Sequence, residues 1–162
     1  MGKIFNYNCL YFDDELESQL NPLEDLIYIL GSKYNLNIAK KDNVKDFREE
    51  LNKGGYKLLF IDIRIDIKKG GGTVGNRPAH RTGIGLIEEI RNGKYEKKNG
   101  EGTPRNIPII VVTAVAEMKA QEEIIKIGRG NNNEYKFALF EKPADDFEIG
   151  DKANEFLQDE KG

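Results

Sequence analysis

Five apolar runs alternate along the chain with five amphipathic segments, and this order constrains the fold more than any other feature. The apolar runs cover residues 4–12, 36–39, 58–63, 107–112 and 137–140. The run at 58–63 is apolar at almost every residue, which is typical of a strand buried on both faces of a sheet. Regular alternation of strands with helices predicts a doubly wound α/β fold with a parallel sheet and right-handed crossovers.

The amphipathic segments carry apolar residues at helical spacing between capping residues. Asn21 and Pro22 form an N-cap and first-turn pair at the start of the first helix. Asp42 or Asn43 is expected to cap the second helix, and Gly54-Gly55 to end it. We expect helices at about residues 22–33, 44–53, 84–91, 118–127 and 145–157, on both faces of the sheet.

Charged and hydroxyl side chains stand where the predicted strands end. Asp13 and Asp14 follow the first strand, and Asp62 lies at the end of the third. Thr113 ends the fourth strand, and Lys142 follows the fifth. Because the carboxyl ends of parallel strands share one edge, these groups are expected to meet in one pocket. Carboxylates suit Mg²⁺, and a hydroxyl and an ammonium suit a phosphoryl group.

Composition excludes several classes of protein. The chain has 162 residues, of which 33% are charged, and a net charge of -3, which gives no indication of nucleic-acid binding. No run approaches the roughly 18 apolar residues of a membrane span, and the N-terminus lacks the apolar region of a signal peptide. The single cysteine, Cys9, is expected to be a small buried hydrophobe. We expect a cytoplasmic protein that binds no membrane and no nucleic acid directly.

The alternation is interrupted by a long glycine-rich and basic insertion at about residues 64–82 and by a second loop at about 93–106. Residues 64–81 hold five basic side chains against one acid, Asp66. Long loops in compact domains are usually functional or disordered. The insertion is therefore either a mobile surface segment or a basic flap that covers an anionic site or docks a partner.

Taken together, these motifs resemble the receiver domain of two-component response regulators. The resemblance covers about residues 4–157. The matching segments are Tyr11-Phe12-Asp13-Asp14-Glu15, Leu59-Phe60-Ile61-Asp62, residues 83–91, residues 108–114, and Glu141-Lys142-Pro143. The resemblance implies a single flavodoxin-like domain over residues 1–162, with a five-stranded parallel sheet in the order 2-1-3-4-5.

The resemblance also implies a role for each residue at the strand ends. Asp62 would be the phosphoacceptor, and Thr113 and Lys142 would contact the phosphoryl group and couple it to a conformational switch. Asp13, Asp14, Asp62 and the backbone carbonyl of Arg64 would hold Mg²⁺. Such a domain is not a turnover enzyme, although it promotes its own aspartyl phosphorylation and dephosphorylation. A histidine kinase or phosphotransfer protein would act upstream.

Two features depart from the family pattern. Some twenty residues separate Asp62 from Gly83, where the family has a short connection. Leu139 stands three residues before Lys142, where the family has its switch aromatic, and strand alternation puts Phe140 on the opposite face. Only about twenty residues follow Lys142, so we expect an atypical stand-alone receiver that acts on a separate effector protein.

Two alternatives to the phosphorylated receiver remain at this stage. One is a pseudo-receiver, which keeps the fold as an interaction module without phosphorylation. The other is a Mg²⁺-dependent phosphohydrolase on the same sheet, although the second aspartate of its Asp-x-Asp motif is missing after Asp62. The glycine-rich segment at 70–77 lacks the Gly-Lys-Ser/Thr ending of a P-loop, and the single histidine, His80, has no metal-ligand partner pattern.

Overall fold

The computed structural model describes residues 7–13, 23–63, 73–74, 77–78, 81–113 and 118–158. The strands are β1 Tyr7–Phe12, β2 Leu36–Lys41, β3 Leu58–Ile63, β4 Thr73–Val74, β5 Arg77–Pro78, β6 Ile109–Thr113 and β7 Phe137–Glu141. The helices are α1 Leu23–Tyr34, α2 Val44–Lys53, α3 Arg81–Arg91, α4 Met118–Arg129 and α5 Asp146–Gln158, with a 3-10 turn, η1, at Asn131–Asn133.

The predicted strands and helices are all present, with shifts at their ends. Asn43 caps α2, because its side chain accepts a hydrogen bond from the backbone of Asp46, and Gly54 ends this helix. Helix α3 begins at Arg81, three residues earlier than the apolar spacing predicts. The short antiparallel pair of β4 with β5 was not predicted. None of the helices in the described ranges has the length and apolar character needed to cross a membrane.

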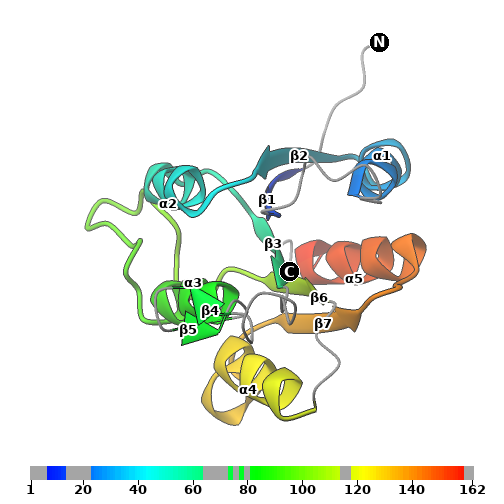
Figure 1. Ribbon diagram of the computed structural model, residues 1–162. Coiled ribbons are helices and arrows are strands. Elements are labelled where there is room, and N and C mark those ends of the chain that lie inside the picture. Colours follow the sequence, from blue (N-terminus) through cyan, green and yellow to red (C-terminus); the bar gives the residue numbers. More distant parts are fainter. Residues whose placement is uncertain are drawn as a thin grey trace.

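Five of the described strands form one sheet in the order β2-β1-β3-β6-β7, in which every pair is parallel. Helices α1 and α5 cover one face of this sheet, and α2, α3 and α4 cover the other (Figure 1). This is the flavodoxin-like order that the resemblance to receiver domains implies. The order reverses at β1, beside β3, and the carboxyl ends of these two strands therefore border the crevice in which such folds bind ligands.

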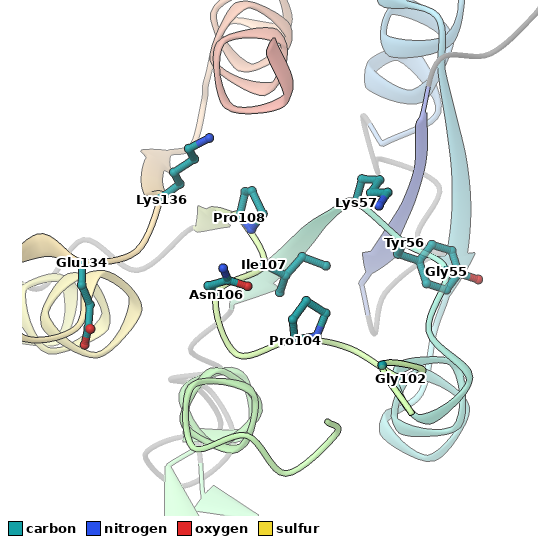
Figure 2. Close-up of a pocket in the computed structure, with 11 residues that line it drawn as sticks. Gly55, Tyr56, Lys57, Gly102, Pro104, Asn106, Ile107, Pro108, Glu134 and Lys136 are labelled. Carbon is teal, nitrogen blue, oxygen red and sulfur yellow. The ribbon is translucent and has the colours of Figure 1, made fainter. Parts of the chain in front are cut away.

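The loop between α3 and β6, residues 92–108, folds back on itself at the amino-terminal edge of the sheet. Glu96 and Gly102 form an antiparallel bridge, and the Thr103 amide donates a 3.0 Å hydrogen bond to the Tyr95 carbonyl. A side chain at Gly102 would lie 2.1 Å from that carbonyl oxygen, and its φ of +84° also requires glycine. The loop borders a pocket that Gly55 also lines, beside the bridge between Gly54 and Gly102 (Figure 2).

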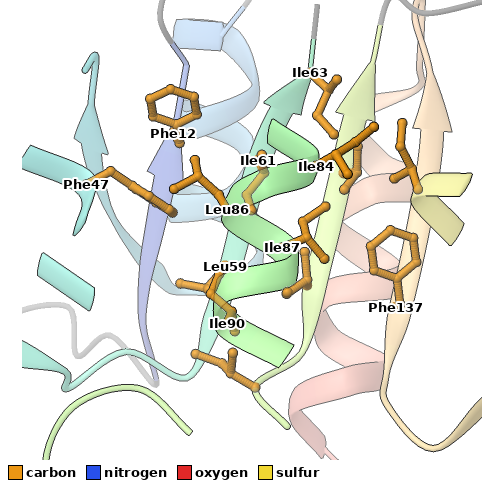
Figure 3. Close-up of a cluster of buried hydrophobic side chains, with 14 of the residues drawn as sticks. Phe12, Phe47, Leu59, Ile61, Ile63, Ile84, Leu86, Ile87, Ile90 and Phe137 are labelled. Atoms are coloured by element: carbon orange, nitrogen blue, oxygen red, sulfur yellow. The ribbon is translucent and has the colours of Figure 1, made fainter. Parts of the chain in front are cut away.

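Alternate residues of the central strands pack into two separate cores. Leu59 and Ile61 of β3 pack with Phe47 of α2 and Ile87 of α3 on one face (Figure 3). Phe60 belongs to the core on the α1 and α5 face, and its ring stacks on Tyr11 with a centroid distance of 5.3 Å. Each strand of the centre is thus buried on both faces, which explains its almost continuous apolar sequence.

Candidate functional site at the carboxyl edge of the sheet

Four of the side chains predicted for the site come from the ends of neighbouring strands. Asp13 follows β1, Asp62 is the last but one residue of β3, and Thr113 ends β6. Phe12 pairs with Ile61, so Asp13 and Asp62 occupy neighbouring register positions. Thr113 pairs with Ile63 on one side and with Glu141, the residue before Lys142, on the other. The sheet therefore brings all four residues to one edge, which we call the carboxyl edge.

Asp62 and Lys142 form an ion pair at this edge. The Lys142 ammonium donates a hydrogen bond to Oδ2 of Asp62 at 2.5 Å. The Asp62 side chain is only 1% exposed, whereas that of Lys142 is 22% exposed. The carboxylate is thus held below the surface and its cation reaches toward solvent. An ammonium at this position can also contact an anionic group that reaches Asp62 from outside.

The strand ends around this pair are joined by short hydrogen bonds. The Thr113 hydroxyl donates to the Ile63 carbonyl at 2.8 Å, and the Lys142 amide donates to the Thr113 carbonyl at 2.7 Å. The peptide bond between Lys142 and Pro143 is cis. The Asp13 amide donates to the Lys41 carbonyl at 3.1 Å. The backbone at the carboxyl edge is therefore fixed by contacts between neighbouring strands.

The oxygen atoms at the carboxyl edge are of the type that binds a hard cation. Counted over the whole residue, Asp13 is 0% exposed and Asp62 is 4% exposed. The two residues follow directly after the paired residues Phe12 and Ile61 of neighbouring strands. Carboxylate oxygens are the side-chain ligands that Mg²⁺ prefers. Asp14 and Arg64, the other predicted ligands, lie outside the described residues. Within the described ranges no group of three acidic, histidine or cysteine side chains could hold a metal ion.

Leu139 and Phe140 of β7 point to opposite faces of the sheet, as strand alternation predicts. Leu139 packs against the core on the α2, α3 and α4 face, and Phe140 packs against the core on the α1 and α5 face. The aliphatic side chain of Leu139 therefore occupies the face on which the family resemblance implies an aromatic switch residue.

Arg91 is a buried cation that the sequence did not reveal. Its guanidinium donates to the carbonyls of Gly128 at 2.8 Å, Arg105 at 2.6 Å and Ile107 at 2.7 Å. The central carbon of the guanidinium, Cζ, also lies 4.6 Å from the centre of the Tyr135 ring. Burial lowers the pKa of the Arg91 guanidinium to about 10. In sequence it looked like an ordinary basic residue in the last turn of a helix, because nothing local signals its burial.

Glu89 is the centre of a second network that sequence reasoning missed. Its carboxylate accepts hydrogen bonds from Arg48 at 2.9 and 3.2 Å, from Lys94 at 3.2 Å and from the Tyr95 hydroxyl at 2.5 Å. Burial works to raise the pKa of Glu89, but the hydrogen bonds from Tyr95, Arg48 and Lys94 lower it overall. The network ties α2 to α3 and to the loop that follows α3.

The single cysteine, Cys9, is buried in β1 and free. Burial raises the pKa of its thiol to about 12, so the thiolate is not accessible at neutral pH. Cys9 is thus a core residue, as the sequence predicted.

Comparison with known proteins gives matches at the level of structure. No protein-family model matches the sequence, and no curated protein does. The receiver domain of the Francisella response regulator 1452 matches with a TM-score of 0.58 and 16% identity, over 95% of this chain and 98% of that one.

Two further solved structures match equally broadly. A signal receiver domain of two-component signal transduction (histidine kinase) from Clostridium thermocellum has a TM-score of 0.65 and 13% identity, over 95% of this chain and 99% of its own. A CheY-like response regulator receiver domain protein from Methanospirillum hungatei JF-1 has a TM-score of 0.62 and 16% identity, over 96% and 98%. The resemblance inferred from the motifs is thus confirmed for the fold, which is that of response-regulator receiver domains.

Proposed function

We propose that this chain is a signalling receiver that accepts a phosphoryl group on Asp62 with the help of Mg²⁺ and then changes a protein-interaction surface. The observation that carries the proposal is the ion pair between Asp62 and Lys142 at the carboxyl edge. A buried carboxylate beside an ammonium combines a nucleophile with a cation that can stabilise the incoming phosphoryl charge. The receiver-domain fold supports the same conclusion.

The reaction is a phosphoryl transfer to a carboxylate. One oxygen of Asp62 forms a bond to phosphorus, and the bond between phosphorus and the leaving group of the donor breaks. The leaving group departs with the electron pair. Lys142 and the hydroxyl of Thr113 then contact the phosphoryl oxygens, for which Thr113 must release the Ile63 carbonyl. The modification adds about −1.5 to −2 charges at neutral pH, enough to reposition both side chains.

Asp13, Asp14, Asp62 and the backbone carbonyl of Arg64 would hold the Mg²⁺ ion. When bound, the ion neutralises charge on the carboxylates and on the transferred phosphoryl oxygens. Asp13 is completely buried next to Asp62, and two such carboxylates repel each other unless a cation or a proton is present.

The proposed partners follow from the phosphoryl-transfer role. A histidine kinase or a phosphotransfer protein supplies the phosphoryl group, and the C. thermocellum neighbour is itself described as part of histidine-kinase signal transduction. A separate effector protein in the cytoplasm reads the phosphorylated state. Residues 1–162 act as one receiver domain in this proposal, and no substrate is turned over.

Leu139 favours a second candidate, a pseudo-receiver that works as an interaction module without phosphorylation. It packs into the core on the α2, α3 and α4 face and carries no ring or hydroxyl that could follow Thr113 in a switch. A phosphorylated receiver with Leu139 must instead transmit the change through the backbone of β6 and β7 or through Phe140.

The mass of the intact protein after incubation with acetyl phosphate and Mg²⁺ separates the two candidates. We expect wild type and Glu141→Gln, which removes an exposed carboxylate of β7 next to Lys142, to gain one phosphoryl group. Asp62→Asn and a reaction without Mg²⁺ should gain none. No gain of mass in the wild type, even at high donor concentration, would favour the pseudo-receiver.

A further inference from the structure

Helix α3 contacts the end of β3 without a side chain of its own in between. A Cβ atom added at Gly83 would lie 2.5 Å from Cγ1 of Ile63 and 3.0 Å from its Cδ1. Ile63, which is 1% exposed, follows Asp62 and is the last residue of β3. Figure 3 shows it beside Ile84 of α3, and both residues belong to the same core. The backbone of the first turn of α3 therefore rests directly on the Ile63 side chain.

The main chain of Ile63 contacts the candidate site. Its carbonyl accepts the 2.8 Å hydrogen bond from the hydroxyl of Thr113, which is completely buried. Ile63 and Thr113 are also paired in the register of β3 and β6. Ile63 thus contacts Thr113 with its main chain and α3 with its side chain. A change in one of these contacts acts on the other through a single residue.

Ile63 can absorb little displacement by itself. Its side chain branches at Cβ and therefore has few rotamers. It is also enclosed in a core, and packed interiors resist compression and transmit strain. When the Thr113 hydroxyl leaves the Ile63 carbonyl, a buried acceptor loses this donor, and the end of β3 must adjust. Because the Ile63 side chain cannot swing aside, part of this adjustment is passed on to Gly83.

The first two turns of α3 have little helical stability of their own. Gly83 and Gly85 both lie in these turns, and glycine has a low helix propensity. The first turn, residues 81–84, also holds no acidic side chain that could interact with the helix dipole. Packing of the buried residues Ile84 and Ile87 against the sheet must therefore hold these turns in place. Their stability depends on the surface against which they pack, of which Ile63 is a part.

The second half of α3 is, in contrast, anchored by polar contacts. Arg91 donates hydrogen bonds to main-chain carbonyls at the end of α4 and in the loop before β6. Glu89 accepts hydrogen bonds from Arg48 and Tyr95. A displacement that reaches Gly83 is therefore expected to loosen the first two turns rather than to move the whole helix.

We propose that residues 81–87 of α3 form a conformational element whose stability is set by the hydrogen bond from Thr113 to Ile63. These turns are closed while the hydrogen bond is present, and they loosen when Thr113 leaves the carbonyl. The inference rests on the proposed function for its trigger alone, because contact of Thr113 with a phosphoryl group on Asp62 breaks the same hydrogen bond. The change starts at the end of β6 and reaches α3 through Ile63, which adds a branch to the routes through β7.

Hydrogen exchange of the unphosphorylated full chain tests the coupling without any phosphoryl transfer. The amides of residues 85–88 report on the first turns of α3, because each helical amide bonds to the carbonyl four residues earlier. Thr113→Val removes the donor and should speed their exchange about tenfold relative to the amides of α5. Thr113→Ser keeps a hydroxyl and should retain the exchange rates of wild type.

Thr103→Val is the matched control for the loss of a buried hydroxyl. The Thr103 hydroxyl is buried and donates a 2.7 Å hydrogen bond to the Leu51 carbonyl, at the amino-terminal edge of the sheet. Its removal should leave exchange at residues 85–88 unchanged. The proposal is overturned if Thr103→Val speeds these amides as much as Thr113→Val does, or if Thr113→Val speeds all helices equally.

Two glycine variants test the contact with Ile63 and leave Thr113 intact. Helix propensity alone predicts slower exchange at residues 85–88 for both Gly83→Ala and Gly85→Ala. At Gly85 nothing lies within 4 Å of the added Cβ atom, so we expect slower exchange there. At Gly83 the added atom collides with Ile63, so we expect faster exchange. Slower exchange in both variants would overturn the proposal, even if Thr113→Val does not fold.

Phosphorylated wild type completes the test. After reaction with acetyl phosphate and Mg²⁺, protein whose mass includes the phosphoryl group should show faster exchange at residues 85–88. If that protein exchanges like the unmodified chain, the inference fails and the proposed function stands. A chain that gains no phosphoryl group contradicts the proposed function instead, and the Thr113 and glycine variants then decide the inference.

Discussion

The ammonium of Lys142 contacts Oδ2 of Asp62 across 80 positions of sequence. The contact exists because β3 and β7 both flank β6 in a parallel sheet, so that their carboxyl ends reach the same edge. It places one cation on the carboxylate that we propose as phosphoacceptor. The ion pair is therefore both a structural link between strands and the element that phosphorylation would rearrange.

Removing this cation should destabilise the protein. Lys142→Met keeps the aliphatic stem but deprives the buried Asp62 carboxylate of its ion pair, which should cost about 2 kcal/mol of unfolding free energy. Urea unfolding of the single variants and of the Asp62→Asn/Lys142→Met double variant measures the coupling. The double variant should be more stable than the sum of the single effects predicts, and strict additivity would contradict a direct interaction.

Arg91 should matter far more for stability than its position at a helix end suggests. Arg91→Met leaves the carbonyls of Gly128, Arg105 and Ile107 without their charged donor, at an expected cost of about 3 kcal/mol. Arg129→Met changes an exposed arginine at the end of α4 and should stay within about 0.5 kcal/mol of wild type. Equal melting temperatures for the two variants would show that the buried contacts are not formed.

The neighbouring glycines Gly54 and Gly55 should respond differently to alanine. A Cβ atom at Gly54 would lie 2.2 Å from the Gly102 carbonyl oxygen, which is backbone and cannot move aside. At Gly55 nothing lies within 4 Å of the added atom, and only the positive φ of +92° is strained. We expect Gly55→Ala to cost about 1 kcal/mol and Gly54→Ala about 3 kcal/mol or more. Thermal unfolding that ranks Gly55→Ala as the worse variant would be incompatible with this packing.

The Glu89 network should make stability depend on acid pH. Because the folded state lowers the pKa of Glu89, its contribution is complete above the ordinary glutamate pKa of about 4.3 and is lost as pH falls through the lower folded value. Glu89→Gln should therefore reduce stability by about 1 kcal/mol at neutral pH. The difference from wild type should shrink below about pH 4. A difference that is constant between neutral and strongly acid pH would exclude an ionised Glu89 as its cause.

The sequence was sufficient to predict the sheet. Its strands are short, and those at the centre are apolar on nearly every residue, so Leu58–Ile63 could be located to the residue. Helix ends were less certain where no capping residue marks them. The pairs Asp42-Asn43 and Gly54-Gly55 located both ends of α2 to within a residue, and the caps are Asn43 and Gly54. Helix α3, in contrast, begins at Arg81, before its first regularly spaced apolar residue, Ile84.

The long-range contacts could be predicted only in part. The common edge of Asp13, Asp62, Thr113 and Lys142 follows from the topology of a parallel sheet. The hydrogen bonds from Arg91 to the carbonyls of Arg105 and Ile107 could not be predicted. They depend on how residues 92–108 fold back at the amino-terminal edge of the sheet. A loop rich in glycine and charge carries no periodic pattern from which that path could be derived.

The location of the phosphoryl group tests the central claim most directly. After reaction with acetyl phosphate and Mg²⁺, borohydride reduces an aspartyl phosphate to homoserine, and peptide mass spectrometry then identifies the modified residue. The account predicts homoserine at position 62 and at no other aspartate. Modification at Asp13 or at another carboxylate, with an unmodified Asp62, would contradict it.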